Sequence, residues 1–430
     1  MQAGTLLVCG AALWVGLLFA AAVYGERRPQ GLARRWAWIY ALSLAVYCTS
    51  WTFYGTVTQA MRHGWWVPPT FVGTILLYLL AWPMLERLVD EARRRNSTSI
   101  ADLLASRFGK STGVAALATG IALIGLVPYI ALQLKAVAQS FDLLAGALFT
   151  ETPRGWGDSA APAAALMALF AMVFGTRRTS ASAHGVVLAM AFESIIKLVA
   201  LLAVGGYAVF VLHGGFGDLA EAARQLPAPT PPGGNFLTLV LLGALAMISL
   251  PHQFHLAVVE CRDPAHVRSA RWLFPAYLLL ISLFLLPLAW AGQLSLVGSA
   301  IPSDLYVLGL PLHSGAEPLA ILAFLGGMSA ASGMVVMATL TLGIMVGNHW
   351  LTPLLLPGSG GDLRLRVLWQ RRAVIVAVMA GAYLYSRFIS AGEVLADVGA
   401  VAFAALAQLA PAVLAALYGP AASRRSVLAG

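Results

Sequence analysis

The sequence predicts an all-α polytopic membrane protein with eleven transmembrane helices. Of its 430 residues, 60% are hydrophobic and only 10% are charged, whereas a soluble domain carries about 25% charged residues. A water-soluble globule is excluded, because no fold of this size shields so much apolar side chain from water. The apolar residues also gather in runs, and most basic residues fall between those runs.

Each run is close to the roughly 20 apolar residues that an α-helix needs to cross a bilayer. The predicted spans, numbered 1 to 11 along the chain, are about 4–24, 36–60, 68–88, 112–145, 160–176, 185–212, 236–256, 272–292, 317–347, 373–389 and 393–418. Span 4 is too long for one straight crossing, so we expect it to tilt or to continue beyond the bilayer.

The distribution of Lys and Arg predicts the orientation. Alternate connections on one side hold 21 of these residues, and those on the other side hold three, Arg62, Arg154 and Arg224. Because Lys and Arg are enriched in cytoplasmic loops, the N-terminus is predicted to lie outside and the C-terminus in the cytoplasm. The net charge of +9 therefore reflects topology, and the expected partner is the lipid bilayer rather than nucleic acid.

The chain shows no sign of an enzyme, since it has no phosphate-binding glycine loop and no nucleophile elbow. Its three cysteines lack metal-ligand spacing, so no metal is expected apart from a coupling ion. The longest cytoplasmic connection, about 89–111, is predicted to hold an amphipathic surface helix. Ser99 and Asp102 resemble a helix start before the apolar residues Leu103, Leu104 and Phe108.

Two predicted spans are interrupted by polar residues, which are costly in hydrocarbon and so mark function or helix packing. Span 2 contains VYCTSWTFYGTVTQA at residues 46–60, and span 7 contains MISLPHQFHL at residues 247–256. Pro251 lacks a backbone donor and obstructs a continuous helix. Taken alone, the first interruption is explained equally well as a packing face of small residues. The second, taken alone, is explained equally well as a helix end near the inner surface.

Together, the interruptions predict an inverted repeat. Spans 2 and 7 lie five spans apart and enter the membrane from opposite sides, so each opens a set of five helices with a broken helix. The predicted organisation is an N-terminal helix and loop (1–35), a first repeat (36–214), a second repeat (236–418) and a cytoplasmic tail (419–430). Pairs of broken helices near the midplane form the solute and ion sites of secondary transporters.

The solute is predicted to bind between the two interruptions, where unwound backbone and aromatic walls meet. The residues assigned to this site are Ser50, Trp51, Tyr54, Gly55, Lys135, Met247, Pro251 and His252. Lys135 in span 4 either faces the central cavity or reaches outward near a helix end.

Two charged residues of span 6, Glu193 and Lys197, are four residues apart and can neutralise each other within hydrocarbon. A structural clamp is the favoured interpretation of this intramembrane charge pair. Asp397, near the outer end of span 11, is predicted to belong either to a gate or to the membrane interface.

Several segments resemble the sodium/solute symporter family: SLAVYCTSWTFYGTV, SIADLLASRFGKS, YIALQLKAVAQSFDLL and PHQFHLAVVE. More narrowly, they are similar to the transporter-like membrane domain of bacterial sensor histidine kinases, whose best-known type responds to histidine. The resemblance covers nearly the whole chain and implies a LeuT-type core of spans 2–11 after one extra helix, in the bacterial inner membrane. It also implies further spans and a cytoplasmic kinase module after Gly430, so that this chain would be truncated before the kinase.

The resemblance implies a function. The chain would bind and transport a small solute, an amino acid such as histidine, together with a cation, as the input module of a sensor kinase. The alternative is a purely sensory domain that binds the solute without net transport. No cofactor is implied beyond a coupling ion, sodium or a proton.

In symporters of this family, a sodium ion lies between backbone carbonyls of span 2 and hydroxyls of span 9. The matching positions are Val46 and Thr49, with Ser329 and Ser332 in GGMSAASGM. The two serines share a helix face because they are three residues apart, although a small-residue helix seam explains them equally well. Cys48 stands where proline/sodium symporters carry an aspartate, which leaves proton coupling, or no coupling, open.

Overall fold

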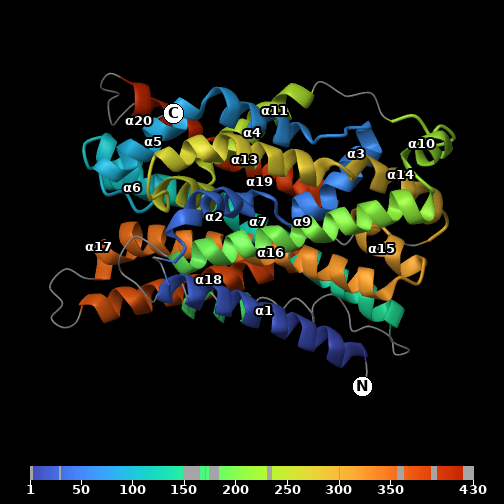
Figure 1. The fold of residues 1–430 in the computed structure, drawn as a ribbon. Helices are drawn as coiled ribbons and strands as arrows, with labels where there is room; N and C mark the ends of the chain where they lie inside the picture. The colour runs from blue at the N-terminus through green and yellow to red at the C-terminus, as the bar shows by residue number, and fades with distance from the viewer. Residues whose placement is uncertain are drawn as a thin grey trace.

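The computed structural model describes residues 3–28, 31–148, 165–169, 171–173, 184–229, 235–299, 301–355, 363–388 and 395–419. These residues form helices and connections, and no β-strand occurs among them. The long helices lie side by side along one common direction, with the N-terminus at one end of the bundle and α20 at the other (Figure 1). Among the described residues, six helices are long and apolar enough to cross a membrane, and two bent pairs raise this number to eight.

The helices match ten of the eleven predicted spans in position, and most of predicted span 5, 160–176, lies outside the described residues. The first half of the chain contains α1 (Ala3–Arg27), η1 (Ala33–Arg35), α2 (Trp36–Ser43), η2 (Leu44–Tyr47), η3 (Trp51–Gly55), α3 (Thr56–His63), α4 (Pro69–Leu80), α5 (Trp82–Arg94), α6 (Ile100–Arg107), α7 (Thr112–Leu148), α9 (His184–Tyr207) and η4 (Ala208–Leu212). The second half contains α10 (Phe216–Ala223), α11 (Phe236–Ser249), α12 (Pro251–Phe254), η5 (His255–Val259), α13 (Ala265–Ser282), α14 (Leu285–Ser295), η6 (Ser303–Leu305), α15 (Tyr306–His313), α16 (Glu317–Val346), η7 (Gly347–Leu351), α17 (Thr352–Leu355), α18 (Leu363–Phe388), α19 (Leu395–Ala407) and α20 (Ala410–Tyr418).

Predicted span 3 is not one straight helix. It divides into α4 and α5, which meet at Ala81 with an angle of 77° between them. Pro83 is the physical reason, because proline suits the first turn of a helix and prevents the preceding helix from continuing. The predicted span at 68–88 therefore falls on a bent pair of helices rather than on one straight helix.

Helix α6 begins where the sequence predicts. The backbone N–H of Asp102 donates to the Ser99 hydroxyl over 3.1 Å, which caps the first turn. The apolar residues Leu103, Leu104 and Phe108 are all buried, and α6 packs against α7 and α20. The amphipathic face therefore covers other helices of the bundle rather than resting on lipid.

Spans 8 and 10 begin earlier than predicted, at Ala265 and Leu363 instead of 272 and 373. Their first turns carry arginines, which lower the hydropathy without interrupting the helix. Span 4 is one continuous helix of 37 residues, about 55 Å long at 1.5 Å per residue. It therefore extends well beyond a hydrocarbon core of roughly 30 Å, as expected.

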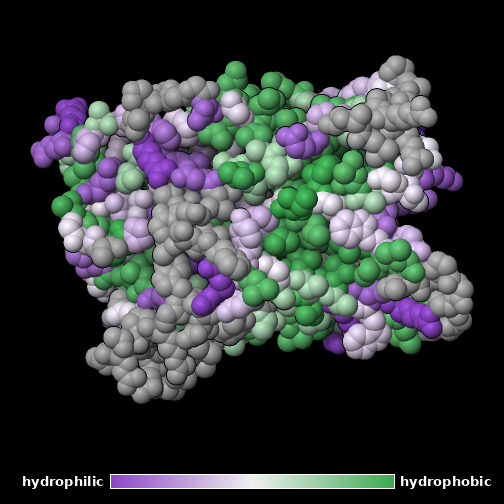
Figure 2. All heavy atoms as spheres, turned by 180° about the vertical axis from the view of Figure 1, so that it is seen from behind, coloured by the Kyte–Doolittle hydropathy of each residue, from purple (hydrophilic) through white to green (hydrophobic). Residues whose placement is uncertain are grey.

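The flank and the ends of the bundle differ in polarity. Figure 2 shows a broad apolar area in the middle of the rear flank, with hydrophilic residues towards the left and right margins of that view. In Figure 1, α5 and α6, which contain Arg87, Arg93, Arg94 and Arg107, lie at one end, with α20, whereas α10 and α15 lie at the other. This division agrees with the alternation of basic connections in the sequence.

Helices α4 and α11 touch backbone to backbone, which joins the first repeat to the second. A Cβ at Gly73 would overlap with the Val240 carbonyl, and a Cβ at Gly243 would overlap with backbone atoms of Thr70. The Thr74 hydroxyl uses this close approach to donate over 3.0 Å to the Gly243 carbonyl. Small residues are the usual means of bringing helices together in a membrane.

Candidate solute-binding site

Span 2 is broken between Tyr47 and Ser50, inside the predicted interruption. Helix η2 ends at Tyr47, and Cys48 has φ −80° and ψ 86°, outside the helical region. Thr49 provides a local reason, because its hydroxyl accepts a hydrogen bond of 3.2 Å from the backbone N–H of Trp51. This side chain takes the part of a helix cap and starts the second half of the span.

Span 7 is broken at Leu250, where α11 and α12 meet at 55°. Leu250 is extended, with φ −68° and ψ 116°, since a residue before proline is disfavoured in the helical region. The break is shorter than the predicted interruption at 247–256, because Met247 still lies in α11 and His252 already lies in α12. Pro251 has no N–H to offer the Met247 carbonyl four residues earlier.

The two broken spans run antiparallel and are joined near their breaks. The Gln253 amide of α12 donates over 3.0 Å to the Leu44 carbonyl, just before the break in span 2. Further along, the Tyr40 hydroxyl donates over 2.7 Å to the Ala257 carbonyl. All four residues are buried, so the pairing of the breaks is part of the protein core.

Gln133 of α7, a residue absent from the predicted site, holds the second half of span 2. Its side-chain oxygen accepts from the backbone N–H of Ser50 over 3.0 Å and from the Ser50 hydroxyl over 2.6 Å. One turn earlier, the Tyr129 hydroxyl lies 3.1 Å from that of Thr49. Lys135 is also buried, but it lies about 200° further around α7 than Gln133, so α7 does not present both side chains to the break.

An aromatic cluster covers one side of the break in span 2. The ring of Phe403, from α19, lies 4.9 Å from Trp51, 6.1 Å from Tyr47 and 5.5 Å from Tyr129 between centroids. Gly399 makes room for this packing, since a Cβ there would lie 2.8 Å from the Trp51 ring. Span 11 thus supplies the outer face of the predicted aromatic wall.

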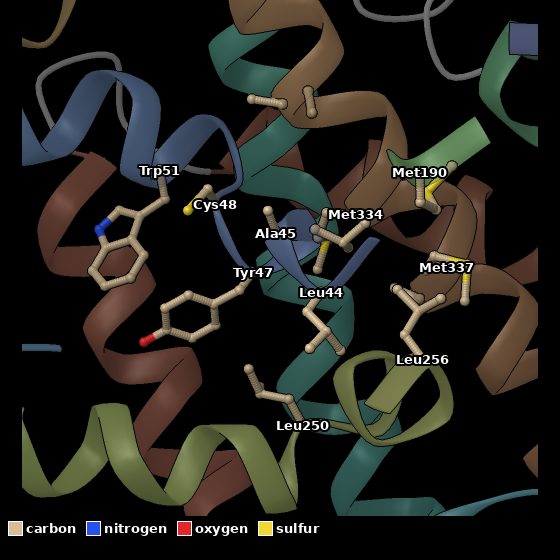
Figure 3. Close-up of a cluster of buried hydrophobic side chains, with 14 of the residues drawn as sticks. Leu44, Ala45, Tyr47, Cys48, Trp51, Met190, Leu250, Leu256, Met334 and Met337 are labelled. Carbon is tan, nitrogen blue, oxygen red and sulfur yellow. The ribbon is translucent and has the colours of Figure 1, made fainter. Parts of the chain in front are cut away.

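Methionines cover the opposite side of the break. In Figure 3, Tyr47 and Trp51 point to one side of the unwound segment, and Met190 of α9 with Met334 and Met337 of α16 gather on the other. All three methionines are buried. Flexible thioether side chains fit irregular backbone well, so this wall can follow changes in the broken helix.

Tyr54 and Gly55, both assigned to the solute site by sequence, lie in η3 and are buried. Tyr54 packs against Gly327 of α16, where a Cβ would overlap with the Tyr54 hydroxyl. Phe53 packs beside Gly326 of the same helix. Among the described residues, the Tyr54 hydroxyl has no hydrogen-bond partner.

His252 is the most unusual polar group at the breaks. It is fully buried, and within the described part of the chain neither ring nitrogen has a hydrogen-bond partner. Its ring lies 6.3 Å from that of Tyr129, which bonds to the other broken span. A buried polar group without a partner costs about 1–3 kcal/mol, so His252 is a strong candidate to bind a ligand.

The four residues assigned to a sodium ion lie in two pairs, one at the break of span 2 and the other on α16. Val46 lies in η2, and Thr49 follows it into the break. Ser329 and Ser332 are buried on α16. The Ser329 hydroxyl donates over 2.9 Å to the Glu193 backbone carbonyl, and the Ser332 hydroxyl donates over 3.2 Å to the Ser329 carbonyl.

Glu193 and Lys197 lie beside these serines and are completely buried. The Lys197 Nζ lies 3.6 Å from the nearer Glu193 carboxylate oxygen. The same Nζ donates a hydrogen bond of 2.8 Å to the backbone carbonyl of Cys48, in the break of span 2. A Cβ at Gly333 would overlap with the Glu193 carboxylate, so α16 closes over this charge only because residue 333 has no side chain.

Polar contacts join neighbouring helices at the end of the bundle that holds α10 and α15. The Thr58 hydroxyl of α3 contacts the buried carboxylate of Asp304 in η6. Arg62, one turn further, pairs with Asp397 of α19 over 3.3 Å, with the Arg62 side chain partly exposed and that of Asp397 largely exposed. Asp397 therefore joins spans 2 and 11 near one end of the bundle, a position that fits both the gate and the interface interpretation.

A second set of polar contacts joins neighbouring helices at the opposite end of the bundle. Asp102 of α6 lies 2.9 Å from the His349 ring of η7, and the Arg107 guanidinium donates to two carbonyls at the end of α20. Burial by itself would raise the pKa of Asp102, but the close His349 ring and two hydrogen bonds from Thr98 outweigh it and hold this pKa below its usual value. The side chains at the breaks, among them Trp51, Tyr54 and His252, are fully buried.

Two broken helices, five spans apart and packed against each other, define a class of protein. The chain is a multi-pass membrane protein with the LeuT-type fold of secondary transporters, in which two inverted repeats of five helices surround the breaks.

Comparison with known proteins places this fold among transporters. No protein-family model and no curated protein matches the chain by sequence. The chain is similar to a Na⁺-coupled sialic acid symporter in its substrate-bound outward-open state, with a TM-score of 0.65 and 14% identity over 98% of this chain and 94% of that one. It is also similar to a nucleobase-cation-symport-1 family transporter (TM-score 0.53, 16% identity, 91% and 80% covered). A manganese transporter of Eremococcus coleocola is a third similar structure (TM-score 0.52, 15% identity, 89% and 78% covered).

Proposed function

We propose that this chain binds a small polar solute between its two helix breaks and carries it across the membrane together with a cation. The observation that carries the proposal is His252, fully buried at the break of span 7 with both ring nitrogens unpaired among the described residues. A neutral imidazole has one N–H donor and one acceptor nitrogen. A solute with both kinds of group would satisfy both.

An amino acid such as histidine is the solute class we propose. Its ammonium group would bind the Met247 carbonyl, which Pro251 leaves without a helical donor. Its carboxylate would lie towards the N-terminus of the half-helix that starts at Ser50, because the positive end of a helix dipole favours an anion. Trp51 and Tyr54 would form the aromatic walls.

We further propose that the chain is the input module of a bacterial sensor kinase in the inner membrane, with its N-terminus outside and no catalytic role of its own. The resemblance of its motifs to that domain class supports this proposal. The purely sensory alternative differs in one observable, because it predicts binding without net flux.

The test is binding of L-histidine to the purified protein. We expect His252→Ala to weaken binding about tenfold, the effect of losing about 1.4 kcal/mol of hydrogen bonding. Its melting temperature should stay equal or rise, because a buried unpaired polar group is removed. His213→Ala, in the connection after η4, is the matched control and should bind as the wild type does. Unchanged affinity in His252→Ala would refute the assignment of the site.

Uptake into proteoliposomes separates the two versions of the function. Accumulation of L-histidine against a gradient requires transport, and binding with no accumulation identifies a sensor.

A further inference from the structure

The break in span 2 exposes a backbone carbonyl to a protein cation. The Cys48 carbonyl accepts a hydrogen bond of 2.8 Å from the Lys197 ammonium, and both residues are at most 1% exposed. Lys197 follows His184 by 13 residues and precedes Leu212 by 15, so it lies near the middle of its span. At 1.5 Å per residue it is about 20 Å from either end.

The charge of Lys197 is balanced locally. The Glu193 carboxylate lies 3.6 Å from Nζ, and among the described residues neither of its oxygens has a hydrogen bond. The pair is enclosed by α16, which approaches through Gly333. A cation, a carboxylate and a helix-break carbonyl therefore form one dry cluster between spans 2, 6 and 9.

This cluster lies where sequence resemblance assigns a sodium ion, between the carbonyls of span 2 and the hydroxyls of span 9. The span 9 hydroxyls of Ser329 and Ser332 donate to backbone carbonyls of α9 and α16, and the Thr49 hydroxyl lies 3.1 Å from that of Tyr129. The group that meets the break carbonyl is the ammonium of Lys197.

We propose that Lys197 is a built-in cation that takes the place of sodium at the broken helix, so that Na⁺ is not an obligatory partner of this protein. The ammonium and a sodium ion carry the same charge, and both bind carbonyl and carboxylate oxygens. The inference deepens the proposed function by excluding one coupling ion. Its test uses no solute. The inference about Na⁺ can therefore be refuted while the proposed solute site is retained, and the solute site can be refuted while the inference about Na⁺ is retained.

The experiment measures the melting temperature of the purified protein in NaCl, KCl and choline chloride at equal ionic strength. We expect the wild type to melt at the same temperature in all three salts. Lys197→Ala should melt lower in choline chloride and regain stability with Na⁺ in a saturable way, because Na⁺ can then neutralise Glu193 beside the Cys48 carbonyl. At ten times its Kd, Na⁺ would raise the folded-to-unfolded ratio about elevenfold.

Two variants complete the design. Glu193→Gln combined with Lys197→Ala removes both charges and should lose the response to Na⁺, and Lys110→Ala, an exposed lysine, should behave as the wild type does. A Na⁺-specific rise in the wild type overturns the proposal, and this arm needs no variant to fold. Equal melting of a folded Lys197→Ala protein in NaCl and choline chloride also overturns it.

Discussion

The Glu193–Lys197 pair allows a double-mutant cycle whose outcome follows from its geometry. Two unit charges 3.6 Å apart attract by about 5 kcal/mol at an effective dielectric constant of 20. Both side chains have no exposure to water, so removing one partner leaves an uncompensated charge in a dry site. The expected loss of stability is about 3–5 kcal/mol for either Glu193→Gln or Lys197→Met.

The double variant should be milder than either single variant. It leaves no buried charge, and its main loss is the charge-assisted hydrogen bond to the Cys48 carbonyl, about 1.5–3 kcal/mol. Lys197→Met should be the worst of the three, because it loses that bond and also leaves the Glu193 carboxylate unpaired. The two single effects should therefore be far from additive.

The assay is the ranking of melting temperatures of the purified variants in one detergent. The matched control is the exposed pair Glu221 and Arg224, 2.8 Å apart with side chains at least 70% exposed. Its single and double variants should not differ measurably from the wild type, since surface pairs contribute little. A double variant of Glu193 and Lys197 that is as unstable as the worse single one would show that the two charges do not compensate each other.

Three further outcomes are expected. Pro251→Ala should insert normally and be at least as stable as the wild type, yet lose L-histidine binding as α11 and α12 join into one helix; unchanged affinity would count against the broken-helix site. Asp102→Asn should melt lower than the wild type at neutral pH, because a carboxyl with a lowered pKa stabilises the fold above its unfolded value of about 3.8. That difference should shrink as the pH falls below about 4, and a constant difference would show that the ionised contact with His349 is unimportant. In a cysteine-free background, an impermeant maleimide should label Arg224→Cys on intact cells but Arg94→Cys only after permeabilisation, and the reverse pattern would invert the topology.

Native Cys261 does not serve for such topology labelling, although its position beside Arg262 at the end predicted to be cytoplasmic suggests it. The thiol is 2% exposed, and burial raises its pKa to about 11. A buried, protonated thiol reacts slowly. The sequence indicates on which side the residue lies, but its accessibility depends on how α13 and its neighbours pack.

The sequence predicts the fold well because its strongest signals are local. Runs of apolar residues mark helices, and Pro251 and Thr49 disturb the backbone within one turn of themselves. The errors of boundary have the same cause. Arginine-rich first turns at Ala265 and Leu363 remain helical although hydropathy excludes them.

The partners across helices could not be predicted from the sequence. Gln133 and Gln253 are single amides in apolar runs, and only the packing of α7 and α12 shows that both bind the backbone of span 2. Glycines are equally ambiguous, because a glycine can allow two helices to pack closely or can make room for a single side chain. Gly333 makes room for the Glu193 carboxylate, and Gly399 makes room for the Trp51 ring.

The part of span 2 around its break, from Leu44 to Ser50, is tied to three different helices, and these ties suggest which helices move together. Its first half bonds to span 7 through the Leu44 carbonyl, its middle to span 6 through the Cys48 carbonyl, and its second half to span 4 through Ser50. Spans 2 and 7 therefore share direct bonds and would move as one unit. Span 4 holds that unit through Gln133 and the Tyr129 hydroxyl, and span 6 holds it through Lys197. Movement of the pair against these two spans must stretch these bonds, and the bond to Lys197 is the strongest because it is charge-assisted. We therefore expect the charge of span 6 to resist this movement, which would connect the cluster of Lys197, Glu193 and the Cys48 carbonyl to solute access.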